Sequence, residues 1–254
     1  LMIVGIAAAR TILQLMQTPE DVMDYSVTYI RIYFLGMIPS SIYNIGSGIL
    51  RAVGDAKRPL YFLIAACFTN IVLDLLFVVV FHWGVAGAGI ATVMSQCLSA
   101  VLVCLVLSRS TESYRVMWHK VRFDSVMLPR IIRIGIPAGL QSVMYNAANI
   151  VVQTSMNTFG TDNVASWTVF EKMDGIYWLV VSAFGVAVTT FVGQNFGARK
   201  FERVKKSVRV SLAMCLSIAI GLSILLICLC PYIFLLFTSD TAVLQGGIFM
   251  IHFM

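Results

Sequence analysis

Residues 59–81 read PLYFLIAACFTNIVLDLLFVVVF, and residues 86–108 read AGAGIATVMSQCLSAVLVCLVLS. Each run is long enough to cross the hydrocarbon of a bilayer, because about 30 Å of it takes roughly 20 residues as a helix. A short His82-Trp83-Gly84 connection separates the two runs. The stretch therefore predicts two membrane helices that form an antiparallel hairpin.

The rest of the chain has the same character. Of its 254 residues, 59% are hydrophobic and 12% charged, with a mean hydropathy of +0.88. A soluble domain carries about a quarter charged residues, so a bilayer is the better solvent for this chain. The fold class predicted is all-α and transmembrane. Further apolar runs are expected to span at 1–17, 25–50, 131–158, 163–191, 208–236 and 241–254.

The charges alternate along the chain between basic and acidic connections. Fifteen of the 18 Lys and Arg residues lie near three connections, at 51–58, 109–133 and 199–209, whereas the alternate connections carry acids such as Asp162 and Asp240. By the positive-inside rule, the loops 51–58, 109–130 and 193–207 are expected to be cytoplasmic. The prediction is a multi-pass protein of the plasma (inner) membrane. No basic stripe lies on a soluble surface, which argues against a nucleic-acid partner.

One polar cluster lies inside the predicted hairpin. Asn70 and Asp74 are four residues apart and share a helical face. Asp74 and Thr92 lie equally far from Trp83, so they are expected at the same depth on the two antiparallel helices. A carboxylate, an amide carbonyl and a hydroxyl together suit H⁺ or Na⁺. The alternative is an Asp74–Asn70 pair that only packs helices.

Several motifs resemble those of the multidrug and toxic compound extrusion (MATE) transporters. The run Arg51-Ala-Val-Gly-Asp-Ala-Lys-Arg-Pro59, followed by Asn70-Ile-Val-Leu-Asp74 and Gly84-Val-Ala-Gly-Ala-Gly-Ile-Ala-Thr92, is similar to the family's fourth to sixth helices. Gly135-Ile-Pro-Ala-Gly-Leu-Gln141 resembles the start of the seventh helix, and Gly193-Gln-Asn-Phe-Gly-Ala-Arg-Lys200 the loop after the eighth.

The resemblance implies a two-lobe bundle of parallel six-helix repeats, with helices three to ten of twelve represented and the bundle truncated at both ends. Residues 1–108 would then belong to the N-lobe, 109–130 would link the lobes, and 131–254 would begin the C-lobe. A weak similarity between residues 13–23 and 234–244 supports such a repeat.

The resemblance also assigns roles. The family's N-lobe cation site matches Asn70, Asp74 and Thr92. Some members carry a glutamate on the seventh helix, where this chain has Gln141, Tyr145 and Asn146 and no acid, which puts a C-lobe cation site in doubt.

A second set of charges lies in the predicted span 163–191. Glu171 and Asp174 are three apart and share a face, while Lys172 is expected to point elsewhere. We expect Glu171 and Asp174, with Gln141, Tyr145 and Asn146, to line a substrate cavity that favours cations. Pairing with neighbouring helices is the alternative reading.

The function predicted is an H⁺- or Na⁺-coupled antiporter that exports drugs or other organic compounds. A lipid-linked oligosaccharide flippase of the same superfamily is the alternative, although only Arg10 and Arg31 lie in spans. An enzyme is not expected, because the three histidines are scattered. No cofactor is expected, and no metal is expected beyond a possible Na⁺ at Asp74. The partners expected are a small-molecule substrate and the lipid bilayer, and the full-length protein is expected to be a monomer.

Overall fold

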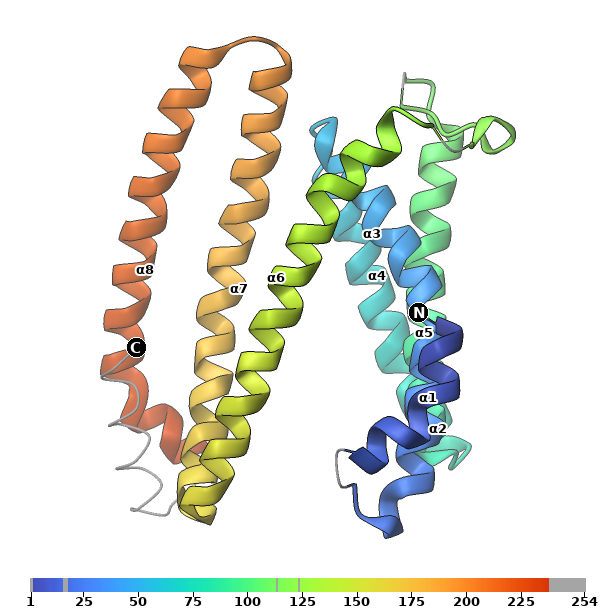
Figure 1. Cartoon of the computed structure of the whole chain (residues 1–254), viewed down its shortest axis with the longest axis vertical. Helices are drawn as coiled ribbons and strands as arrows, with labels where there is room; N and C mark the ends of the chain where they lie inside the picture. The colour runs from blue at the N-terminus through green and yellow to red at the C-terminus, as the bar shows by residue number, and fades with distance from the viewer. Residues whose placement is uncertain (1, 16–17, 113, 123, 238–254) are drawn as a thin grey trace. The chain divides into compact units, whose positions relative to one another are not determined.

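The computed structural model describes residues 2–15, 18–112, 114–122 and 124–237 (Figure 1). Every regular element in these residues is a helix. The chain divides into two compact units, Leu1–Val121 and Arg122–Met254, and the boundary falls within the 109–130 connection. The expected span at 241–254 lies outside the described residues, as does most of the 234–244 segment of the suspected repeat.

The first unit is built around one central helix, α5 (Gly84–Arg109). Among the unit's other elements, α2, α3, α4 and the π-helical segment η1 contact it. The other elements of the unit are α1 (Met2–Leu15), α2 (Glu20–Leu35), α3 (Met37–Ala52), α4 (Lys57–Asp74) and η1 (Leu75–Val80), with the short 3₁₀ turn η2 (Trp118–Lys120) after α5. Small residues on α5 make its central position possible, because Gly87, Gly89, Ala91, Ser95 and Ser99 are all buried.

The expected span at 25–50 is wrong as a single helix, because the helix is interrupted at Gly36, between α2 and α3. Pro39 explains the break. Proline has no N–H, so inside a continuous helix it would leave the carbonyl of Leu35 without its usual donor. With the break at Gly36, Pro39 falls in the first turn of α3, where no such donor is needed.

The predicted hairpin at 59–108 is confirmed, with one change in its first helix. The α-helical part ends at Asp74, and the next six residues form the π-helix η1. The amide of Phe81 accordingly donates to the carbonyl of Leu76, five residues back, at 2.9 Å. His82, with φ of 55°, and Gly84, also at 55°, turn the chain into α5.

The second unit contains α6 (Met127–Met156), the 3₁₀ turn η3 (Asn157–Phe159), α7 (Thr161–Gly197) and α8 (Phe201–Phe237). Helices α7 and α8 lie side by side as a long hairpin (Figure 1). A small core joins them at the end away from their connection. Its buried members are Val169, Met173, Leu226, Cys230 and Phe234.

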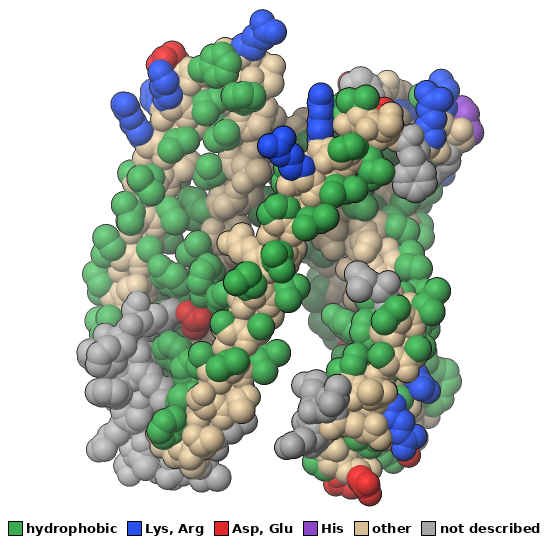
Figure 2. Space-filling model, in the orientation of Figure 1, with side chains coloured by type: hydrophobic (Ala, Val, Ile, Leu, Met, Phe, Trp, Pro, Cys, Tyr) green, Lys and Arg blue, Asp and Glu red, His purple; other side chains and the backbone are tan. Residues whose placement is uncertain are grey.

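Much of the surface of both units is apolar (Figure 2), as expected of helices that face lipid or further helices. Ile134 and Leu179, for example, are 74% and 73% exposed. Four helices of the described part are long and apolar enough to cross a membrane, namely Lys57–Val80, Gly84–Arg109, Asn163–Gly197 and Phe201–Cys230. Helix α6 has the length but carries Arg130, Arg133 and several polar side chains, while the break at Gly36 makes α2 and α3 too short.

Candidate functional site

Asn70 and Asp74 lie in the last two turns of α4, directly before the π-helix. Nδ2 of Asn70 and Oδ1 of Asp74 are buried and have no hydrogen-bond partner in the described part of the chain. A buried polar atom without a partner costs about 1–3 kcal/mol. A buried polar group without a partner calls for an explanation, of which an ion or a water molecule is one, and π-helical turns are frequent at functional sites. In the described residues, Nδ2 of Asn70 and Oδ1 of Asp74 therefore do not satisfy each other.

Thr92 lies on the facing helix α5 and is partly buried. Its hydroxyl donates to the carbonyl of Ala88, one turn back in the same helix, at 3.0 Å. Because the hydroxyl hydrogen is used in this bond, the lone pairs of Oγ1 remain free to accept a hydrogen bond or to bind a cation.

Gln96 is a polar residue of this region that the sequence interpretation missed. Its Oε1 is the third buried side-chain atom without a partner in the described residues. Asn70 and Gln96 are equally distant in sequence from Trp83, as Asp74 and Thr92 are, and Gln96 is one helical turn from Thr92. The same spacing argument that selected Thr92 could therefore have selected Gln96.

Two glycines let α5 approach its neighbours closely. A Cβ on Gly87 would lie 3.0 Å from Cβ of Phe77 in η1, and a Cβ on Gly89 would lie 3.1 Å from Cγ2 of Ile32 in α2. The small-residue run before Thr92 thus brings α5 against the π-helix that follows Asp74. It also brings α5 against α2, which the sequence did not predict.

The second unit holds a separate cavity of about 1000 Å³ between α6 and α7. All five residues expected to line a substrate cavity border it: Gln141, Tyr145 and Asn146 from α6, and Glu171 and Asp174 from α7. Aromatic side chains complete the wall. The rings of Tyr145 and Trp178 meet edge to face at 5.9 Å between centroids.

Lys172 also borders this cavity, although its spacing placed it off the face shared by Glu171 and Asp174. The cavity is wide enough to be bordered by side chains from a broad arc of the α7 surface. In the described part of the chain, neither Glu171 nor Asp174 forms an ion pair, with Lys172 or with any other residue. The wall therefore combines two carboxylates that form no ion pair with one ammonium group and aromatic rings.

The family model MatE matches residues 1–76 and 137–254, which is most of the chain. Among curated proteins, the chain is 34% identical over 207 residues to the "Probable multidrug resistance protein YpnP" of Bacillus subtilis (strain 168), covering 79% of this chain and 44% of that protein. It is 30% identical over 220 residues to the "Probable multidrug resistance protein YoeA" of the same organism, covering 84% and 47%. The chain thus spans about half the length of these relatives.

The fold is also similar to solved structures. A "Crystal structure of MATE in the bent conformation" superposes with a TM-score of 0.88 at 22% identity, over 98% of this chain and 56% of that one. The family match, the relatives and the helical fold agree with one another. The chain belongs to the MatE family of multi-pass membrane transporters.

Proposed function

We propose that this chain forms part of a cation-coupled antiporter that exports drugs or other organic compounds by alternating access. The observation that carries the proposal is the pair of buried, unpartnered polar atoms on Asn70 and Asp74, on a hairpin that also carries Thr92. The relatives are named as multidrug resistance proteins, which favours drug export over the oligosaccharide flippase.

Asp74 would be the coupling residue. A proton or a Na⁺ ion cancels the charge of its carboxylate, and the oxygens of Asn70 and Thr92 complete an oxygen-rich site. Coupling requires that the cation bind one conformation more tightly than the other. The charge state of Asp74 would then bias which side of the membrane the transporter opens to.

The cavity between α6 and α7 would receive the substrate. Its volume of about 1000 Å³ is at the upper end for small-molecule sites. Carboxylates attract organic cations, and the rings of Tyr145 and Trp178 offer them aromatic faces. The chain needs no cofactor or enzymatic chemistry for this role.

Asp74→Asn in the intact protein tests the proposal, because the substitution keeps the volume and removes the titratable charge. Ion-driven export of a dye from proteoliposomes should fall to the background rate, while dye still equilibrates down its gradient. Thr92→Ala should cause a smaller loss, because it removes one neutral oxygen. Glu112→Gln, a neutralised acid outside the spans, is the matched control. Export by Asp74→Asn against a gradient at the normal rate would place the coupling site elsewhere.

A further inference from the structure

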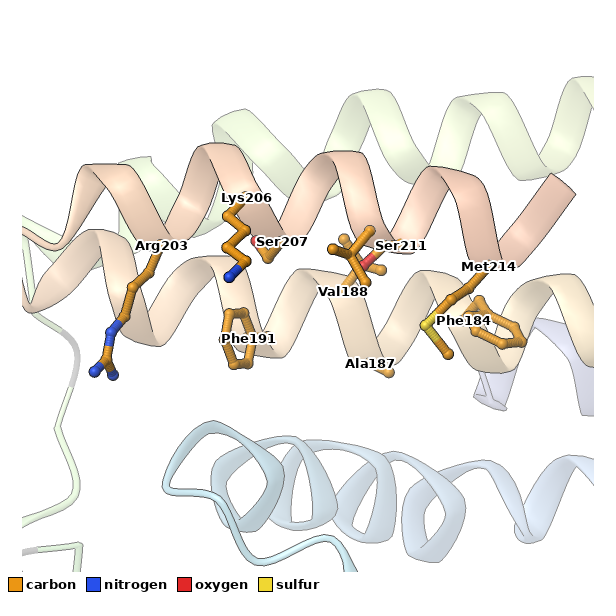
Figure 3. A pocket seen from close by; sticks show the side chains of 10 residues that line it. Phe184, Ala187, Val188, Phe191, Arg203, Lys206, Ser207, Ser211 and Met214 are labelled. Carbon is orange, nitrogen blue, oxygen red and sulfur yellow. The ribbon is translucent and has the colours of Figure 1, made fainter. Parts of the chain in front are cut away.

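The α7–α8 hairpin carries an apolar groove close to the basic connection between its two helices (Figure 3). The groove has a volume of about 480 Å³. Phe184, Ala187, Val188 and Phe191 line it from α7, and Val210 and Met214 line it from α8. The core at the other end of the hairpin does not extend this far, because its buried members on α7 end at Met173 and those on α8 begin at Leu226.

Two cations border the groove at the end nearest the connection, Arg203 and Lys206 (Figure 3). In the described residues neither belongs to an ion pair. The acid closest in sequence, Glu202, is bound instead by Lys205, with 3.2 Å between Nζ and Oε1. The positive charge at the mouth of the groove is therefore uncompensated.

The dimensions of the groove match one leaflet of a bilayer. From Lys206 to Met214 the helix rises about 12 Å, at 1.5 Å per residue. Half of the hydrocarbon core is about 15 Å thick. If the basic connection lies at the membrane surface, the apolar part of the groove runs from the headgroup level almost to the middle of the bilayer.

This groove differs in chemistry from the cavity between α6 and α7, which is bordered by carboxylates and amides. Uncompensated cations above an apolar channel complement a molecule with an anionic head and a hydrocarbon tail. We propose that the groove binds an anionic phospholipid of the leaflet on the side of the basic loops. The phosphate would lie against Arg203 and Lys206, and one acyl chain would follow the groove. This site is independent of the cation site proposed above.

The test compares phosphatidylglycerol with phosphatidylcholine of identical acyl chains, bound to the intact protein and counted by native mass spectrometry. The unsubstituted protein should retain phosphatidylglycerol preferentially. Arg203→Gln with Lys206→Gln should lower the affinity for phosphatidylglycerol by tenfold or more, since each basic residue near a lipid surface contributes roughly a fivefold preference. Ala187→Phe should reduce the retention of both lipids, because the ring fills the groove.

The matched control is Arg199→Gln with Lys200→Gln, which removes one Arg and one Lys from the same connection outside the groove and leaves the Lys205–Glu202 pair intact. This control should keep the preference for phosphatidylglycerol. An equal loss in both double variants would mean that only the general charge of the loop attracts lipid, and would overturn the proposal. So would a photoreactive residue at position 188 that crosslinks to protein instead of phospholipid, since a protein segment would then cover the groove.

Discussion

Gln96 lies beside the break between α2 and α3 and is one helical turn from Thr92. A Cβ on Gly36 would collide with Oε1 of Gln96, so the glycine at the break is what allows this side chain its position. Gln96 therefore contacts the Pro39-induced break on one side and belongs to the polar face of Thr92 on the other. We expect this contact to couple the α2–α3 break to the polar side chains around Thr92.

We expect Gln96→Leu to make the protein more stable and the transporter less active. The substitution removes a buried acceptor without a partner, which should raise the free energy of unfolding by about 1 kcal/mol. Thermal unfolding in detergent and ion-driven dye export measure the two effects. Gly36→Ala should also reduce export, because it displaces the Gln96 side chain, and the two substitutions should not be additive. Additive losses would show that Gly36 and Gln96 act independently.

We expect Glu171 and Asp174 to decide substrate preference. In the intact protein, Glu171→Gln with Asp174→Asn should reduce export of cationic dyes by about tenfold and leave neutral substrates nearly unchanged, because the carboxylates of the cavity are lost. Transport assays with a cationic and a neutral dye of similar size measure this ratio. Glu202→Gln, an acid outside the cavity, is the control. An equal loss for both dyes would mean that the two acids only maintain the structure.

At the scale of helices, some glycines allow another element to approach closely, whereas others have no neighbour near their Cβ position. Gly87→Ala should lower the free energy of unfolding by about 1–3 kcal/mol, because the new Cβ meets Cβ of Phe77 at 3.0 Å and Cβ of Trp83 at 3.1 Å. Gly48→Ala in α3 is the matched control, since nothing lies within 4 Å of its Cβ position. The control should be neutral or stabilising by up to about 1 kcal/mol. Equal melting temperatures for the two variants would contradict this packing of α5.

The start of α6 depends on an acid in the connection before it. Oδ1 of Asp124 accepts hydrogen bonds from the amides of Val126 at 2.8 Å and Met127 at 2.9 Å. The hydrogen bond from the Met127 amide, followed by that from Val126, lowers the pKa of Asp124 below its ordinary value of 3.8. The ionised form is thus the one that caps the helix. The stability that this cap contributes is fully present above the ordinary pKa of 3.8, and it is lost as the pH falls through the lowered pKa of Asp124.

We therefore expect Asp124→Ala to speed amide hydrogen exchange at Val126 and Met127 at neutral pH, and Asp124→Asn to do so less, because an amide oxygen still accepts. Hydrogen–deuterium exchange of the intact protein measures this effect. Glu112→Ala, which removes another acid of the same connection, should leave the two amides unchanged. Unaltered exchange in Asp124→Ala would show that this acid does not cap α6.

At the scale of the whole molecule, the charges predict the orientation in the membrane. Lys and Arg gather at one end of the α7–α8 hairpin (Figure 2), as the positive-inside rule expects of a cytoplasmic end. Cysteines introduced at Lys120 and Lys205 should react with an impermeant thiol reagent only from the cytoplasm. Cysteines at Asp162 and Asp240 should react only from outside. The six native cysteines must first be replaced. Reaction of all four positions from one side would disprove the topology.

The sequence alone determined the class of the protein, the α4–α5 hairpin and the shared face of Asn70 and Asp74. These features depend on local quantities: the length of an apolar run, the turn residues between two runs, and spacings of three or four along a helix. The motif resemblance added the family, which the comparisons confirmed. Spacing also placed Glu171 and Asp174 on one face, and they border one cavity with the three α6 residues.

Other features were decided only by the tertiary structure, because they arise where helices distant in sequence meet. At Gly36, the helix is interrupted near Pro39, which lacks an N–H. The side chain of Gln96 approaches the same point from α5, about sixty residues further along the chain. Lys172 borders the cavity because the space between α6 and α7 is wide, and no helical periodicity encodes that width. The position of a polar side chain along a helix is a local property, whereas its neighbours are set by the close packing of whole helices.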